Sequence, residues 1–127
     1  MNVNVKVISH KKHRYPTCGD WYYDNDNNLQ VRVSRLPDGR YEQLLMVHEF
    51  VEALLCDAAG VTDDEVTAFD KEFERQRPVG STTEPGDEVR APYHKQHRIA
   101  TAIEMLLAAE LGVDWAEYEK ALNNLPE

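Results

Sequence analysis

The sequence has little of several features that would place it in a familiar class of protein. No uninterrupted apolar run approaches the roughly 20 residues that a membrane-spanning helix needs, and the N-terminal segment has no apolar stretch typical of a signal peptide. Two cysteines, Cys18 and Cys56, are too few for a disulfide framework. These absences predict a cytoplasmic protein in a reducing compartment.

Basic charge is also scarce. The chain has 14 Lys and Arg residues against 23 Asp and Glu residues, which gives a formal net charge of −9. A field of this sign opposes binding to nucleic-acid phosphates and to anionic membranes. A basic cluster that leaves a local phosphate contact open is formed by Lys6, Lys11, Lys12 and Arg14.

The apolar content is sufficient for one core. With 127 residues, 42% of them hydrophobic, the chain is the size of a single domain, here a metal-binding domain over residues 1–127. Alternating polarity predicts strands at 3–7, 21–23 and 29–33, and helical periodicity with capping signals predicts helices at 41–59, 63–76, 92–111 and 115–123. We therefore predict an α+β fold in which about four helices cover a small antiparallel sheet of about three N-terminal strands.

The helix predicted at 41–59 is apolar nearly all round, a pattern typical of buried helices. Its polar residues His48, Glu49 and Glu52 gather in one arc of roughly 100°. A buried carboxylate is costly unless it is paired or binds a metal. His48 and Glu52, at i and i+4, can reach one ion, while Glu49 can hold a water on it. This arc predicts a divalent metal site, with zinc as the expected ion; the alternative is a core histidine paired with a carboxylate.

The helix predicted at 92–111 offers a third ligand. Its residues His97 and Glu104 share a side that borders an apolar stripe, and His94 lies about 60° away, one turn earlier. We predict His48, Glu52 and His97 as ligands, with His94 as an alternative or fourth ligand. Glu104 lies about 10 Å beyond His97 along the helix axis, so we expect it to orient a ligand. The apolar stripe consists of Ile99, Ala100, Ile103, Leu107 and Leu111.

These motifs carry a resemblance to known proteins. Strands followed by a helix with His48-Glu49-Phe50-Val51-Glu52, and a ligand from a later helix, resemble the zincin metalloproteases over residues 29–105. Glu52 stands where zincins have their second histidine, so this would be an HExxE variant with two His and one Glu as zinc ligands. The chain also resembles small proteins of bacteriophages and prophages, through His48-Glu49-x-x-Glu52-Ala-Leu-Leu-Cys56 and Pro92-Tyr93-His94-x-x-His97.

Three functions fit these residues. The first is a zinc hydrolase, peptidase-like as the resemblance implies, in which Glu49 activates a metal-bound water and Tyr93 or His94 stabilises the oxyanion. The second is a magnesium enzyme that uses Glu49 and Glu52 with later carboxylates such as Glu104, as in all-helical nucleotide pyrophosphohydrolases. The third is a non-catalytic, metal-stabilised protein that binds a phage or host partner. The identity of the bound metal, and whether it has an open coordination position, would distinguish these three functions.

Three other segments have a predicted role. The loop 77–91 is acidic, contains Pro and Gly, and leads into the helix that carries His97, so we expect it to border and gate the metal site and to favour basic or neutral peptides. The segment Asp24-x-Asp26-x-Asn28 resembles a calcium loop but lacks the later Gly and Glu, which indicates a turn. His10-x-x-His13 with Cys18 is a weaker candidate for a second metal site.

Overall fold

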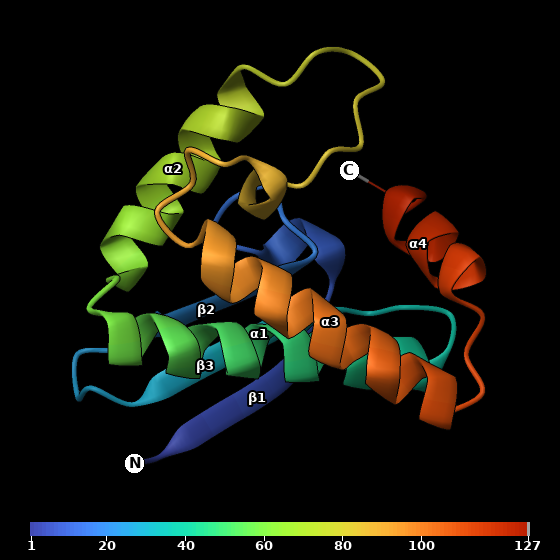
Figure 1. Cartoon of the computed structure of the whole chain (residues 1–127), viewed down its shortest axis with the longest axis horizontal. Coiled ribbons are helices and arrows are strands. Elements are labelled where there is room, and N and C mark those ends of the chain that lie inside the picture. The colour runs from blue at the N-terminus through green and yellow to red at the C-terminus, as the bar shows by residue number, and fades with distance from the viewer. Residues whose placement is uncertain (127) are drawn as a thin grey trace.

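The computed structural model describes residues 1–126 and folds them into three strands and four α-helices (Figure 1). The strands are β1 (Val3–Ile8), β2 (Gly19–Tyr23) and β3 (Leu29–Ser34). The helices are α1 (Gly39–Ala59), α2 (Asp63–Arg75), α3 (His94–Glu110) and α4 (Trp115–Asn123), with short 3-10 turns η1 (His10–Lys12) and η2 (Pro85–Asp87) in the loops. The predicted α+β class is confirmed.

The sheet is mixed, whereas we predicted an antiparallel one. Its order is β1-β3-β2: β2 and β3 form the predicted antiparallel hairpin, but β1 runs parallel to β3. The central strand β3 is the most buried of the three, and its Leu29, Val31 and Val33 side chains are fully buried. The connection from β1 to β3 includes β2. It is therefore long enough for the chain to return and place β3 beside β1 in the parallel direction.

Helix α1 forms the middle layer of the molecule. It packs against β2 and β3 on one side and against α3 on the other (Figure 1). The helix begins after Asp38, whose side chain accepts a hydrogen bond from the backbone of Arg40, and it ends at Gly60, whose φ of 75° is the left-handed conformation that glycine adopts readily. Side chains of α1 and α3 that point toward each other are therefore shielded from water.

Two apolar clusters hold this arrangement. One joins the sheet to α1 and α2 through residues that include Trp21, Val31 and Ala53. The other joins α1 to the C-terminal helices and includes the fully buried side chains of Leu44 and Tyr118. Since both clusters contain residues of α1, this helix is fixed relative to the sheet and to the C-terminal helices.

Several local predictions agree with the structure. Thr62 and Glu65 form the predicted capping box at the start of α2. Asp24 accepts hydrogen bonds from the backbone of Asp26 and Asn28, so the segment that resembles a calcium loop is a turn. Within residues 1–126, no helix is both long enough and apolar enough to cross a membrane.

Candidate metal centre

The buried polar side chains of α1 and α3 face each other. On α1, His48, Glu49 and Glu52 are 5%, 8% and 4% exposed, and on α3, His97 and Glu104 are 6% and 5% exposed. The polar arc predicted on α1 therefore points into the protein. Carboxylates buried to this extent need partners that compensate for the loss of water.

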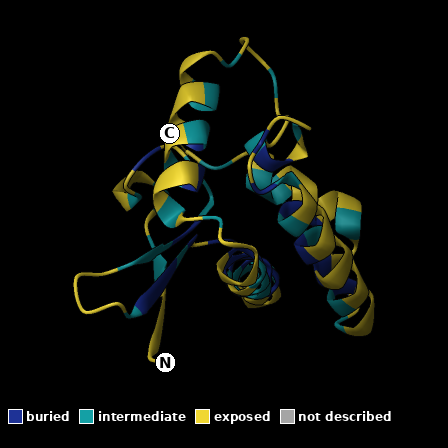
Figure 2. Cartoon of the chain, turned by 60° about the vertical axis from the view of Figure 1, so that its left-hand side comes forward, coloured by how far each residue is buried: buried dark blue, intermediate teal, exposed yellow. Residues whose placement is uncertain are grey.

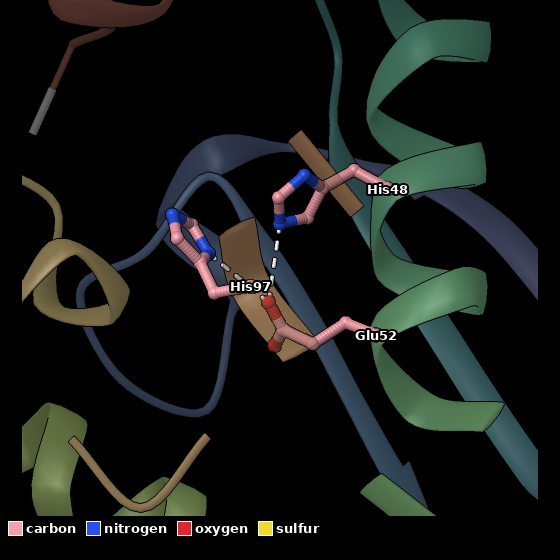
Figure 3. Close-up of side chains that lie close together, drawn as sticks. All are labelled: His48, Glu52 and His97. Atoms are coloured by element: carbon pink, nitrogen blue, oxygen red, sulfur yellow. Dashed lines mark hydrogen bonds and ion pairs between the residues drawn. The ribbon is translucent and has the colours of Figure 1, made fainter. Parts of the chain in front are cut away.

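Glu52 lies at the centre of this group (Figure 3). Its Oε2 atom is 3.1 Å from His48 Nε2 and 3.1 Å from His97 Nδ1, while its Oε1 atom accepts a 3.0 Å hydrogen bond from the indole of Trp21. Donor atoms of the three residues all lie within 4.8 Å of one another. Ligand atoms at about 2.0 Å from a tetrahedral zinc are about 3.3 Å apart. The trio therefore has the residue types and the approximate spacing of a zinc site.

A carboxylate holds the outer ring nitrogen of His48. Glu104 Oε1 lies 2.8 Å from His48 Nδ1, and the other oxygen of Glu104 accepts a hydrogen bond from the hydroxyl of Tyr118. Because a carboxylate accepts, Nδ1 of His48 carries a proton, and Nε2 faces Glu52. Histidines that bind metals commonly have such a carboxylate on the other ring nitrogen.

The outer ring nitrogen of His97 faces the loop that precedes α3. Glu84 Oε2 and Asp87 Oδ1 lie 3.0 and 3.2 Å from His97 Nε2, but neither is aligned as a hydrogen bond, and this buried nitrogen has no hydrogen-bond partner. Gly86 packs against the ring so closely that a Cβ would lie 2.3 Å from the imidazole. Glu84, Asp87 and His97 form a second possible ligand group, although both carboxylates are exposed.

The inner ring nitrogens of His48 and His97 both face Glu52 Oε2. His48 carries its outer proton against Glu104, so its Nε2 would direct a lone pair at Glu52, an arrangement that is repulsive unless Nε2 holds a second proton or a metal ion. His97 can donate to Glu52 with a proton on Nδ1, or direct its lone pair at the same metal ion. The group could therefore hold a cation, for which protons and metal would compete.

In the metal-free protein, the pKa values of His48, His97 and Glu52 favour protonated rings beside an ionised carboxylate. Burial disfavours charged rings, but the contacts with Glu104 and Glu52 outweigh it and raise the pKa of His48 well above its ordinary value. Burial likewise opposes a charged His97, but its contacts with Glu52 and Glu84 raise its pKa to about 10. Burial opposes ionisation of Glu52 as well, yet the hydrogen bonds from the two histidines lower its pKa to about 2.

Glu49 lies beside this group and is not part of it. Its carboxylate packs against the start of β2, where a Cβ on Gly19 would lie 2.5 Å from Glu49 Oε1, so a larger residue at that position would displace the Glu49 carboxylate. Burial raises the pKa of Glu49 well above its ordinary value, and the charge of Glu52 adds to the effect while His48 opposes it. A carboxyl group with a raised pKa beside a metal site is a candidate general base.

His48, Glu49, Glu52, His97 and Glu104 border one large cavity of about 1160 Å³. Its walls come from the segment that leads into β2, the polar side of α1, one side of α2, the loop that precedes α3, and the end of α4. Ligand pockets commonly measure about 300–1,000 Å³, so the space is sufficient for a peptide segment. The loop 77–91 borders the site as predicted; its gating role stays a prediction.

Two predicted residues have other partners. His94 is the first residue of α3, so its ring reaches back to η2, where Nδ1 lies 2.9 Å from the carbonyl oxygen of Gly86. It is therefore not part of the His48, Glu52 and His97 group. Tyr93 donates its hydroxyl to Asp70, which also accepts from Tyr15, so this hydroxyl is already engaged.

Sequence reasoning missed four residues of the site: Trp21, Glu84, Asp87 and Tyr118. The only sequence signal for Trp21 and Tyr118 is general, since a buried indole N–H or phenol O–H needs an acceptor. Glu84 and Asp87 belong to the acidic loop, in which no periodicity indicates the direction of a given side chain.

The histidines near the N-terminus contact a serine and not the predicted second metal site. His10 Nδ1 and His13 Nε2 lie 2.8 and 2.9 Å from the hydroxyl of Ser34, which is fully buried. Cys18 directs its thiol at the backbone oxygen of Leu122, 3.7 Å away. Across residues 1–126, these side chains do not form a group with metal-ligand spacing.

Comparison with known proteins adds no relative. No family model, no curated protein and no solved structure matches the chain. The resemblance to zincins and to phage proteins therefore stays a prediction, and the functional argument rests on the geometry of the site.

Proposed function

We propose that the protein is a zinc-dependent hydrolase that cleaves peptide bonds, with His48, Glu52 and His97 as zinc ligands and Glu49 as the general base. One observation carries the proposal: each histidine directs its outer nitrogen at a carboxylate, which leaves His48 Nε2, His97 Nδ1 and Glu52 Oε2 together beside Glu49 in a large cavity.

The ligand chemistry supports zinc over magnesium. Two imidazole nitrogens and one carboxylate oxygen form a ligand set common in catalytic zinc sites, whereas magnesium prefers oxygen ligands and retains water. The magnesium alternative drew on later carboxylates such as Glu104, but both oxygens of Glu104 are engaged, one by His48 and one by Tyr118. We therefore retain zinc as the proposed ion.

The protein groups around the site have distinct tasks. Zinc held by three protein ligands would lower the pKa of a water in its fourth position toward about 7. Glu49 takes a proton from the attacking water and passes it to the leaving amine. Trp21 fixes the orientation of Glu52, and Glu104 fixes the tautomer of His48, so that the three donor atoms stay together.

The charge of the cavity supports a basic or neutral substrate. Besides the proposed ligand Glu52 and the base Glu49, its walls include more carboxylates than cations. A field of this sign attracts cationic segments and repels acidic ones. The additional carboxylates are Asp20, Asp70, Glu74, Glu84 and Glu104, and the cations are Lys11 and Arg77.

The experiment is cleavage of a library of unstructured peptides by zinc-loaded protein, read by mass spectrometry. We expect wild-type protein to cleave peptides that carry Lys or Arg, and Glu49→Gln to keep zinc while its turnover falls by about 10²–10⁴-fold. Glu88→Gln, which makes the same chemical change in the loop 77–91 at a carboxylate outside the metal group, is the matched control. Unchanged turnover in Glu49→Gln, or no cleavage by zinc-loaded wild type, would contradict the proposal; the second result would favour the non-catalytic alternative.

A further inference from the structure

Helix α3 presents an apolar face to solvent. Ile99, Ile103, Met105 and Leu106 are 40%, 38%, 49% and 71% exposed. The opposite side of the helix buries His97, Ala100, Glu104 and Ala108 against the rest of the protein. Exposed positions follow the solvent side of α3 along its length (Figure 2). Contiguous apolar surface of this kind is typical of interaction sites.

The spacing of this face is that of a helix-pairing seam. Ile99, Ala102, Leu106 and Ala109 follow one another at intervals of three, four and three residues, and all four are exposed. This is the repeat by which two helices pack along their length. The two alanines allow the helix axes to approach closely. Ile103 lies beside the seam, and the whole set spans an arc of about 120° at 100° per residue.

The charges at the two ends of the seam are opposite. Lys95 is exposed near the N-terminal end of α3, and Glu110 is exposed at its C-terminal end. When two copies of this helix are placed antiparallel with the centre between residues 102 and 103, Lys95 of each copy lies opposite Glu110 of the other. In the same alignment Ile99 lies opposite Leu106. A parallel pair would instead place like charges together.

We propose that α3 forms a symmetric antiparallel pair with α3 of a second copy of this chain. The face is self-complementary, as a two-fold interface requires. Its local charges balance, although the chain as a whole carries −9. His97 and Glu104 point away from the seam toward α1, so the metal centre lies outside the interface and the proposal is independent of the proposed enzymatic function.

The first test is sedimentation equilibrium of the full chain over a range of concentrations. We expect a mass that rises toward that of two chains, and we expect Leu106→Glu to raise the dissociation constant at least about tenfold, as loss of a central interface residue does. Val79→Glu, which changes an exposed apolar residue in the loop, is the matched control and should behave as wild type. A single-chain mass at all concentrations would overturn the proposal, as would unchanged association of Leu106→Glu.

The second test examines the antiparallel alignment. Lys95→Glu alone and Glu110→Lys alone should each weaken association, because each places like charges at both ends of the seam. The double variant should restore association to the wild-type level, since each pair is then opposite in charge again. These residues are 15 positions apart on one helix, about 22 Å, so a restored pair must be between copies. Failure of the double variant to recover overturns the antiparallel pairing.

Discussion

The two faces of α3 reverse the usual arrangement of a surface helix. The inward face carries the polar side chains of His97 and Glu104, while the outward face carries Ile99, Ile103 and Leu106. A helix stabilised by apolar burial alone would direct its apolar face toward the core and its polar face toward solvent. The inward face is tolerated because its polar groups compensate one another: Glu104 is paired with His48 and Tyr118, and His97 with Glu52. The comparison indicates that the polar contacts of His97 and Glu104 with α1 and Tyr118 contribute to the orientation of α3.

The largest expected effect comes from neutralising Glu52, the carboxylate of α1 that contacts His97 on the inward face of α3. Glu52→Gln should abolish zinc binding and lower the free energy of unfolding of the metal-free protein by about 3 kcal/mol or more, because two buried histidines lose their shared counter-charge. Denaturant titration and metal analysis measure the two effects. Glu110→Gln makes the same chemical change on the outward face and, at concentrations where the chain is monomeric, should leave both unchanged. An equal loss in the two variants would contradict the difference between the faces.

A smaller effect is expected where the loop contacts the inward face. Gly86→Ala places a methyl group against the ring of His97, so we expect a loss of about 1–3 kcal/mol in stability together with weaker zinc binding. Gly39→Ala is the control, because a Cβ there meets nothing within 4 Å. Thermal unfolding of both variants tests this prediction. Wild-type stability and zinc affinity in Gly86→Ala would show that the loop does not support His97.

The inward face should also respond to pH. The pKa of His97 is raised from 6.5 to about 10 in the metal-free protein. The stability from its extra proton is therefore fully present below pH 6.5 and is lost as the pH rises toward 10. Zinc would replace that proton, so its apparent affinity should rise at least about tenfold, or about 1.4 kcal/mol, per pH unit until the pH reaches about 10.

Titration calorimetry in buffers of different ionisation enthalpy would count the protons released when zinc binds. We expect release from His97 at neutral pH, with a further contribution from His48, whose pKa is also raised. Zinc binding without proton release between pH 6.5 and 8.5 would contradict the predicted competition between protons and metal.

The smallest effect is expected on the outward face. Ile103→Gln, measured at concentrations where the chain is monomeric, should change stability by no more than about 0.5 kcal/mol, as for an ordinary surface position, and should leave zinc content unchanged. Thermal unfolding and elemental analysis check this. A loss of several kcal/mol would mean that Ile103 is part of the core and that the two faces do not differ as described.

The sequence predicted the α1 half of the site well, because helical periodicity alone places His48, Glu49 and Glu52 on one arc. It also identified His97, since few residue types can complete such a ligand set. His94, predicted as an alternative or fourth ligand, lies outside the His48, Glu52 and His97 group, because angular position does not reveal that the first residue of a helix can turn back to the preceding loop. Trp21 was missed because the contact between β2 and α1 is set by tertiary packing.

Periodicity also could not determine orientation. It shows that Ile99 and Ile103 share a side of α3, but not whether that side faces the core or solvent, which depends on the partners that the other side finds. The same limit applies to β1: alternating polarity predicts a strand at Val3 to Val7 but does not identify its neighbour or the direction of pairing, which is parallel to β3.

The most direct test of the account is the metal content of protein purified without an affinity tag and never exposed to a chelator. We predict one zinc per chain in wild type and in Glu49→Gln, and none in Glu52→Gln or His97→Ala. Wild-type protein without a transition metal, or full zinc occupancy in His97→Ala, would contradict the proposal that His48, Glu52 and His97 form a zinc site.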